Sequence, residues 1–137
     1  MMLAVGRLDY ISEDGIRRLV DAFYVKVRAD PELAPIFARA IPGDWQPHLT
    51  KMYAFWSSVM LTTGRYKGNP VARHLAIPDM KPELFERWLT LFDATCSELF
   101  DDATSEAFRI KAERIAESLK LALFYRPDRP WPPEPTP

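Results

Sequence analysis

The sequence predicts an all-α protein made of one helical domain, residues 1–125, and a short tail, residues 126–137. Apolar residues recur at three- and four-residue spacing along most of the chain, which is typical of amphipathic helices. No segment bounded by turns alternates between apolar and polar residues, as a half-buried strand would. Six of the thirteen prolines fall in the tail, so we expect it to be extended and disordered.

Size and charge narrow the class of protein. A chain of 137 residues is long enough for one domain with its own core, and it needs no metal or disulfide to fold. The formal net charge of −1 favours neither nucleic acid nor a membrane surface as partner. The N-terminus resembles no signal peptide, and no apolar run is long enough to span a membrane. We therefore expect a cytoplasmic protein, and a monomer.

The single cysteine, Cys96, excludes an intrachain disulfide and fits a reducing compartment. Its helical neighbours Thr95 and Leu99 lie on the side expected to face the core. We therefore expect Cys96 to be a buried packing residue.

The first helix is expected to begin after Ser12, a candidate N-cap followed by two acidic residues. Its apolar stripe is Ile16, Leu19, Val20, Phe23, Tyr24 and Val27. Asp30 and Pro31 are expected to end this helix and open a short one through Leu33, Ile36 and Phe37.

A third helix is expected over residues 45–62, with Asp44 as its candidate N-cap. One stripe holds Trp45, His48, Leu49, Met52, Trp56, Val59 and Met60, and Tyr53 and Phe55 widen it. Because the apolar surface is so broad, we expect this helix to be covered on more than one side.

A turn-rich connection follows at residues 64–70, and His74 lies on a short segment that Pro78 ends. Pro82 is expected in the first turn of a long helix that carries Leu84, Phe85, Trp88, Leu91, Phe92, Thr95 and Leu99. A last helix carries Phe108, Ala112, Ile115, Leu119 and Leu123.

The chain has two histidines, His48 and His74, and both lie in apolar stretches. Taken singly, each is most simply a core histidine bonded to a backbone carbonyl. Tyr24 and Trp88, on the inward stripes of two other helices, carry polar groups that need partners when buried. Together these residues would form an apolar pocket with a few convergent donors, the usual form of a small-molecule site.

The kind of cofactor can be narrowed further. Two histidines 26 positions apart, with no cysteine or carboxylate at ligand spacing, fall short of the ligands that zinc needs. Haem needs only one imidazole from the protein, since its porphyrin supplies four nitrogens.

The residues that could surround such a cofactor occur in a characteristic order. They are Phe23-Tyr24, the segment DPELAPIF at 30–37, His48 with Phe55-Trp56, GRYKGNPVARHL at 64–75 and FERWLTLF at 85–92. In this order and spacing the chain resembles the truncated haemoglobins, and its third group most closely. The resemblance covers residues 10 to 125 approximately. The chain has no Gly-Gly pair and carries a histidine at the distal position, and both features favour the third group.

The resemblance implies a truncated globin domain at residues 1–125, a two-over-two helical sandwich around haem b. His74 would be the proximal iron ligand, with its other ring nitrogen donating to a backbone carbonyl or water. Tyr24 and Trp88 would donate hydrogen bonds to a bound diatomic ligand. His48 would donate to the ligand, swing out as a gate, or bind ferric iron, and these three alternatives stay open.

Further residues are expected around the haem. Those that would line the haem or the ligand space are Phe23, Phe37, Met52, Phe55, Ile77 and Phe92. Lys51 and Arg73 lie near the two histidines in the sequence and would pair with the haem propionates, although charged residues on helix surfaces are often simply solvated.

The expected function is that of a b-type haem protein that binds oxygen, nitric oxide and carbon monoxide. The polar side chains expected beside the ligand, Tyr24, His48 and Trp88, favour redox chemistry on small ligands over oxygen transport. That chemistry would be either nitric oxide detoxification or peroxide reactions. Whether the chain is an enzyme stays open; a peroxidase or a nitric oxide dioxygenase-like activity would need a separate reductase, because the sequence has no flavin or nicotinamide fingerprint. The alternative is a cofactor-free helical interaction module with the proline-rich tail as a docking peptide.

Overall fold

Helices account for most of the described chain in this computed structural model, which describes residues 7–75, 77 and 79–124. The helices are α1 (Glu13–Ala29), α2 (Leu33–Ala40), α3 (Gln46–Leu61), α4 (Pro70–Leu75), α5 (Pro82–Leu99) and α6 (Asp102–Phe124). Within those residues the only β feature is an isolated bridge between Leu8 and Phe100. The all-α prediction is confirmed, and the expected tail at 126–137 lies outside the described residues.

Most predicted helix boundaries are confirmed by their caps. The Gly15 amide donates to the Ser12 hydroxyl at 3.0 Å, so Ser12 is the N-cap of α1. That helix ends at Ala29, with Asp30 as its C-cap just before Pro31. Pro82 opens α5, where its missing amide hydrogen is not needed.

The prediction that Asp44 is the N-cap of α3 is wrong. The cap residue is Trp45, and no side chain caps the helix there. Asp44, one residue before the cap, accepts a hydrogen bond at 3.1 Å from the amide of Gln46, the first residue of α3. Pro47 lies in the first turn and has no amide hydrogen, so fewer free donors need a side-chain cap.

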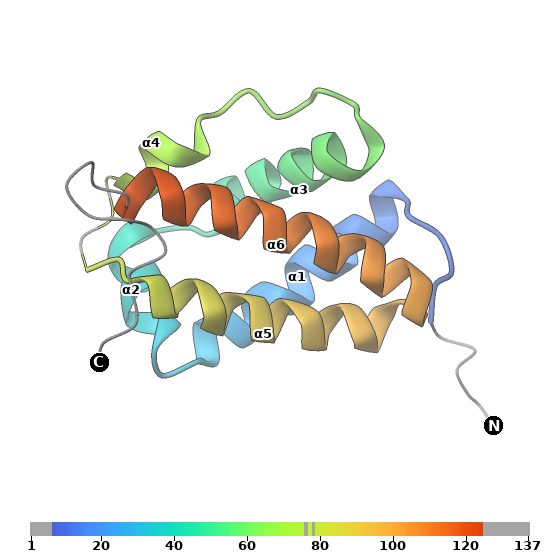
Figure 1. Ribbon diagram of the computed structural model, residues 1–137, viewed down its shortest axis with the longest axis horizontal. Coiled ribbons are helices and arrows are strands. Elements are labelled where there is room, and N and C mark those ends of the chain that lie inside the picture. Colours follow the sequence, from blue (N-terminus) through green and yellow to red (C-terminus); the bar gives the residue numbers. More distant parts are fainter. Residues whose placement is uncertain (1–6, 76, 78, 125–137) are drawn as a thin grey trace, which may run out of the picture.

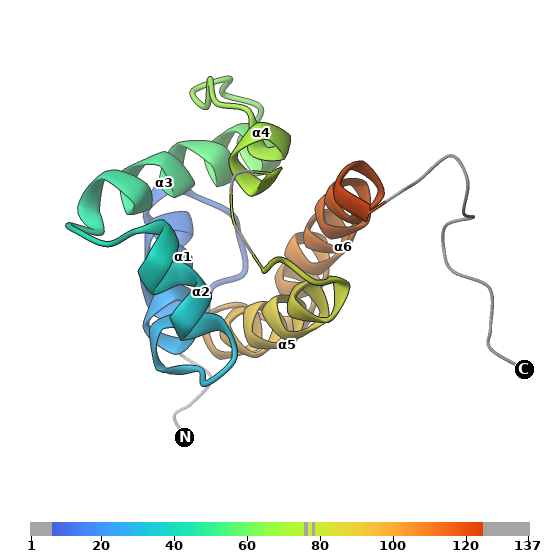
Figure 2. The same ribbon diagram turned by 90° about the vertical axis from the view of Figure 1, so that its left-hand side faces the viewer.

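The helices form two antiparallel pairs, α1 with α3 and α5 with α6 (Figures 1 and 2). The pairs are joined by α1, which packs against α5 as well as α3. The short helix α4 lies beside α3 in both views and packs on α6. This arrangement is the expected two-over-two sandwich.

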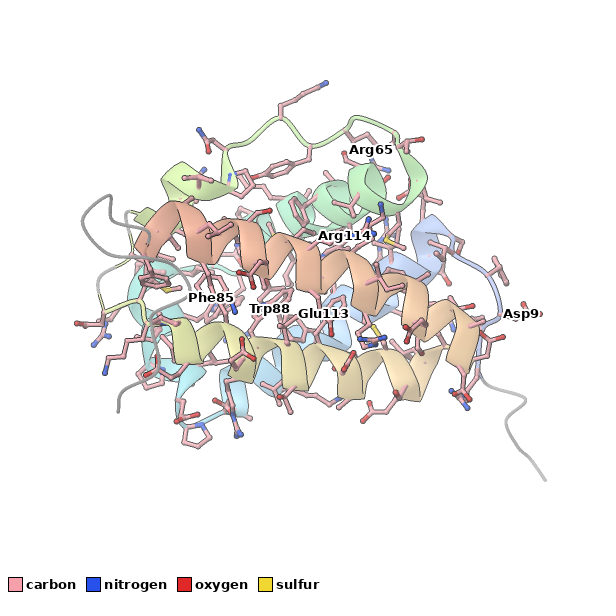
Figure 3. All side chains as sticks on the ribbon, in the orientation of Figure 1. Asp9, Arg65, Phe85, Trp88, Glu113 and Arg114 are labelled. Atoms are coloured by element: carbon pink, nitrogen blue, oxygen red, sulfur yellow. The ribbon has the colours of Figure 1, made fainter. Side chains whose placement is uncertain are left out.

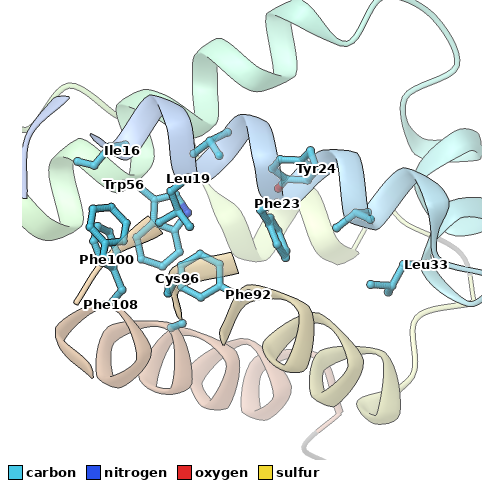
Figure 4. Close-up of a cluster of buried hydrophobic side chains, with 13 residues drawn as sticks. Ile16, Leu19, Phe23, Tyr24, Leu33, Trp56, Phe92, Cys96, Phe100 and Phe108 are labelled. Atoms are coloured by element: carbon cyan, nitrogen blue, oxygen red, sulfur yellow. The ribbon is translucent and has the colours of Figure 1, made fainter. Parts of the chain in front are cut away.

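Aromatic side chains fill the core where α1, α3, α5 and α6 meet (Figure 4). The Trp56 and Phe92 rings stack with centroids 4.9 Å apart, and Phe100 stacks on Phe108 at the same distance. Cys96 is fully buried here, as predicted, and burial raises the pKa of its thiol to about 12. This thiol therefore stays protonated and acts as a packing group.

The connection between α3 and α4 is anchored at its α3 end. The Tyr66 amide donates to the Ser58 hydroxyl at 2.9 Å. The buried Ser57 hydroxyl donates to Glu13 at 2.7 Å and lies 2.8 Å from the Thr63 hydroxyl. Gly64 adopts a φ of +69°, which glycine allows without strain. These bonds fix where the connection leaves α3 and hence where it brings Tyr66.

Candidate functional site

A cavity of about 580 Å³ lies among the helices, and all six contribute to its wall. This volume is in the range of about 300–1,000 Å³ that is usual for cofactor and small-molecule sites. Most of the predicted site residues line it: Tyr24, Phe37, His48, Lys51, Met52, Phe55, Arg73, His74, Ile77 and Trp88. Residues up to 64 positions apart in sequence, from Tyr24 to Trp88, are thus brought to one space.

Phe23 and Phe92, which were expected to line this space, lie behind its wall. Both are buried in the aromatic core and are not among the cavity-lining residues. The Phe23 ring packs edge-on against the rings of Tyr24 and Trp88, with centroids 4.9 and 5.2 Å apart. Phe92 stacks on Trp88 at 5.2 Å with an interplanar angle of 6°. The helical period puts them on the inward side, but that side faces the core here. They therefore hold the lining residues in place without lining the cavity.

His74 is held by a hydrogen bond within α4. Its Nδ1 lies 2.7 Å from the Pro70 carbonyl oxygen, one helical turn earlier. Since a carbonyl can only accept, Nδ1 donates this bond, and of the two neutral tautomers it selects the one with the lone pair on Nε2. Phe85 flanks the imidazole, with ring centroids 6.1 Å apart. His74 thus has the tautomer that a metal ligand needs.

His48 is enclosed by three aromatic rings. The ring centroids of Tyr24, Trp45 and Phe37 lie 5.1, 5.6 and 6.4 Å from that of His48, and each meets it close to edge-on. Its Nε2 is buried and has no hydrogen-bond partner among the described residues. Burial lowers the pKa of His48 to about 4, helped by the nearby charges of Lys51 and Arg73. His48 is therefore neutral at physiological pH.

Tyr24 and Trp88 bring polar groups to an otherwise apolar wall. The Tyr24 side chain is buried, and burial raises the pKa of its phenol above the usual value. Its hydroxyl is therefore always protonated near neutral pH. Trp88, which projects from α5 toward the interior in Figure 3, lines the same cavity and carries an indole N–H that can only donate.

Three basic side chains line the cavity at its exposed side. Arg39 pairs with Asp79 at 3.1 Å. Lys51 and Arg73 are both exposed, and neither forms an ion pair with any described residue. Two unpaired cations beside an apolar cavity suit a cofactor that carries carboxylates at one edge.

These residues fit haem. The cavity is lined mainly by apolar side chains, and one imidazole offers a free Nε2. A second imidazole that lines the cavity, that of His48, has a buried nitrogen without a hydrogen-bond partner among the described residues. Among the described residues no three histidine, cysteine or carboxylate side chains are grouped as a metal site of their own. An iron held here would take its remaining ligands from a porphyrin.

The sequence matches the family described as bacterial-like globin over residues 10–121. The chain belongs to this globin family. Globins bind haem and, through it, diatomic gases, so this globin is a haem-based diatomic-ligand protein. None of the described helices is long and apolar enough to cross a membrane.

One relative refines the assignment to the truncated globins of the third group. This globin is 32% identical to the group 3 truncated hemoglobin ctb of Campylobacter jejuni over 86% of its own length and 95% of the relative's. The crystal structure of the group III truncated hemoglobin from Campylobacter jejuni superposes with a TM-score of 0.82 over the same shares of the two chains. The structure of Chlamydomonas reinhardtii THB1 is 27% identical and matches with a TM-score of 0.61 over 83% of this globin and 91% of that chain.

The structure of this globin adds residues that sequence reasoning gave no role. Tyr66 lines the cavity and packs edge-on against Phe55 at 5.2 Å. Arg39 lines it from α2, where nothing in the helical pattern distinguishes it from any exposed arginine. Trp45 does not line the cavity but contacts three residues that do. Its position on the same stripe as His48 was the signal that could have revealed it.

Proposed function

We propose that the cavity holds haem b with His74 as the iron ligand, and that Tyr24, His48 and Trp88 control small ligands there. The observation that carries the proposal is the hydrogen bond between His74 and the Pro70 carbonyl. It selects the tautomer with a free Nε2 and orients the ring, as the second-shell partners of metal-bound histidines do. Nδ1 of His74 is already in use, so Nε2 is the nitrogen left for a metal.

The polar residues would act on ligands by hydrogen bonding. Haem iron, when bound, supplies reversible coordination and electron transfer to small ligands. The Tyr24 hydroxyl and the Trp88 indole donate, so they favour a ligand that carries negative charge over carbon monoxide. The neutral His48 ring either donates or accepts through Nε2. The exposed cations Lys51 and Arg73 would pair with the propionates.

The hydrogen-bonding side chains Tyr24, His48 and Trp88 support redox chemistry over oxygen transport. The redox chemistry would be either nitric oxide detoxification or peroxide reactions. Three polar groups at one apolar cavity hold a ligand more firmly than fast delivery needs, and they polarise an oxygen–oxygen bond. We place the protein in the cytoplasm as a monomer served by a separate reductase. Peroxide consumption by the haem-loaded protein, followed in a stopped-flow instrument, tests the redox role; no turnover in the parent protein would count against it.

The iron ligand is tested by His74→Ala, with His48→Ala as the matched control. Each substitution removes one of the two imidazoles from the same cavity. We expect His74→Ala to lose the normal ferrous Soret spectrum and to recover it when free imidazole is added, while His48→Ala keeps a five-coordinate ferrous haem. The reverse pattern would make His48 the iron ligand and overturn the assignment.

The same spectra test the cofactor-free interaction module that the sequence left open. If the purified parent protein shows no Soret band and takes up no haem on reconstitution, the proposed haem function fails as a whole. Family membership and the fit of the cavity residues favour the haem protein.

A further inference from the structure

His48 is the distal group that sequence reasoning left most open, and the structure surrounds it with aromatic rings rather than hydrogen-bond partners. Its Nε2 has no partner among the described residues, so no hydrogen bond from that atom holds the ring inside. Packing against the rings of Tyr24, Phe37 and Trp45 helps to position this part of the side chain. Two of these rings, Tyr24 and Phe37, belong to the cavity wall itself.

Trp45 differs from the other two rings because it lies outside the cavity wall. It precedes His48 by one helical turn, at the N-terminal end of α3. The centroid of its ring lies 5.6 Å from that of His48, 5.8 Å from that of Tyr24 and 6.0 Å from that of Phe37. The indole therefore backs all three side chains at once, although it is itself only half-buried.

A charged group from a different helix also lies over the Trp45 ring. The Arg28 guanidinium, in the last turn of α1, lies 4.7 Å from the centre of the Trp45 ring. A guanidinium at this distance is attracted to the electron-rich indole face. The pair thereby connects the end of α1 to the start of α3 across the surface behind His48.

We propose that the Arg28–Trp45 pair is a latch that holds His48 inside the cavity. Trp45 is a positioning residue: it acts on small ligands through His48, whose outward swing needs the indole to move away from its contact. This inference rests on the proposed haem function, in which His48 faces small ligands at the cofactor. It assigns a role in ligand access to two residues outside the cavity wall.

The position of His48 can be measured directly by chemical modification. Diethyl pyrocarbonate modifies neutral imidazoles that reach solvent, and the chain has only two histidines, so mass spectrometry of peptides can follow each one. The experiment uses the haem-loaded carbonmonoxy protein, in which His74 would be protected by the iron. The modification rate at His48 then reports how often its ring leaves the cavity.

Trp45→Ala should raise the modification rate at His48 about five- to tenfold, the factor expected for the loss of one or two aromatic ring pairs. Arg28→Ala should raise it about two- to fivefold, since it removes only an exposed cation–π contact. Trp45→Phe, which keeps a ring at this place, should lie close to the parent protein. Carbon monoxide association should accelerate in the same order.

Arg17→Ala is the matched control. Arg17 lies 5.3 Å from the centre of the Tyr53 ring, so it makes the same kind of exposed contact between α1 and α3. Neither Arg17 nor Tyr53 lines the cavity. This variant should leave the His48 modification rate and carbon monoxide association unchanged.

A double-mutant cycle separates a latch from general loosening of the fold. In a His48→Leu background, Trp45→Ala should no longer accelerate carbon monoxide association, because the group it positions is gone. Acceleration of the same size in both backgrounds would overturn the proposal, and so would unchanged His48 modification in Trp45→Ala and Arg28→Ala.

If Trp45→Ala does not fold, Arg28→Ala and Trp45→Phe still decide the question. A parent protein that takes up no haem would instead overturn the proposed function, which is a different and recognisable result.

Discussion

At the residue scale, the feature with the clearest functional consequence is the buried Tyr24 hydroxyl. It belongs to α1, which packs on both α3 and α5, and the Phe23 ring beside it packs edge-on against the Tyr24 ring. Burial keeps the phenol protonated. A rigid neutral donor in an apolar cavity makes a stronger hydrogen bond than one that competes with water.

Tyr24→Phe should therefore speed oxygen dissociation from the haem-loaded protein. The loss of one hydrogen bond to a charged acceptor is worth about 1.5–3 kcal/mol, which is roughly a tenfold to hundredfold change in rate. Stopped-flow displacement of oxygen by carbon monoxide measures the rate. An unchanged or slower rate would exclude Tyr24 as a ligand donor. Carbon monoxide dissociation should change far less, because that ligand accepts hydrogen bonds weakly.

At the element scale, the junction of α1, α2 and α5 depends on one buried carboxylate. Asp30 accepts bonds from the Glu32 and Leu33 amides at 3.0 and 2.9 Å, and from Arg87 of α5 at 2.7 Å. Burial alone would raise the pKa of Asp30, but the bonds from Arg87 and the two amides outweigh it and lower the pKa below 3.8. Asp30 is thus charged and stabilising at neutral pH, and it fixes the helix that carries Phe37.

Asp30→Asn should lower the free energy of unfolding by about 1–3 kcal/mol at pH 7, since it removes the charge from buried hydrogen bonds. A lowered pKa means that the stabilisation is fully present above the unfolded-state pKa and is lost as the pH falls through the folded-state pKa. The difference between parent and variant should therefore be constant from pH 5 to pH 8 and shrink below about pH 4. Urea unfolding across this range measures it.

Glu32→Gln is the control for this prediction. Glu32 approaches the same Arg87 side chain at 3.6 Å but is itself exposed. An exposed ion pair contributes about 0–1 kcal/mol, so this variant should unfold almost as the parent does. Equal destabilisation by the two substitutions would show that burial of Asp30 has no special effect.

At the scale of the whole molecule, the two helical pairs enclose a cavity instead of closing on each other. Aromatic rings fill the core where α1, α3, α5 and α6 meet, whereas other residues of all six helices face the cavity of about 580 Å³. An apolar cofactor there would complete the packing. Its binding free energy would then add to the stability of the fold.

Haem binding should therefore protect the helices unequally from hydrogen exchange. Backbone amides of α4 and of the N-terminal half of α3 should gain protection on haem loading, because these segments border the cavity. Amides in the middle of α1, which pack on the filled core, should change least. Exchange followed by mass spectrometry on haem-loaded and haem-free protein measures both. Equal protection of every helix, or none, would contradict this division.

The sequence determined the helical class, the order of the helices and most of their ends, because these depend on local features. Ser12, Pro31 and Pro82 act on their own neighbours, and the apolar period shows which side of each helix faces inward. The cap of α3 was placed one residue early, because Asp44 has a side chain that can cap a helix and Trp45 has none, yet the helix begins after Trp45.

Only the tertiary structure decided which inward residues meet the cavity and which meet the core. Phe23 and Tyr24 are adjacent in sequence and both buried, yet only Tyr24 lines the cavity. The reason is the 100° step between helical neighbours, which turns the Phe23 ring toward α5 and the Tyr24 ring toward α3. The contact of Arg28 with Trp45 likewise joins the end of α1 to the start of α3, and no local pattern sets how these two helices meet. Helical period fixes a side chain's direction on its own helix, but the neighbour it meets depends on how separate helices pack.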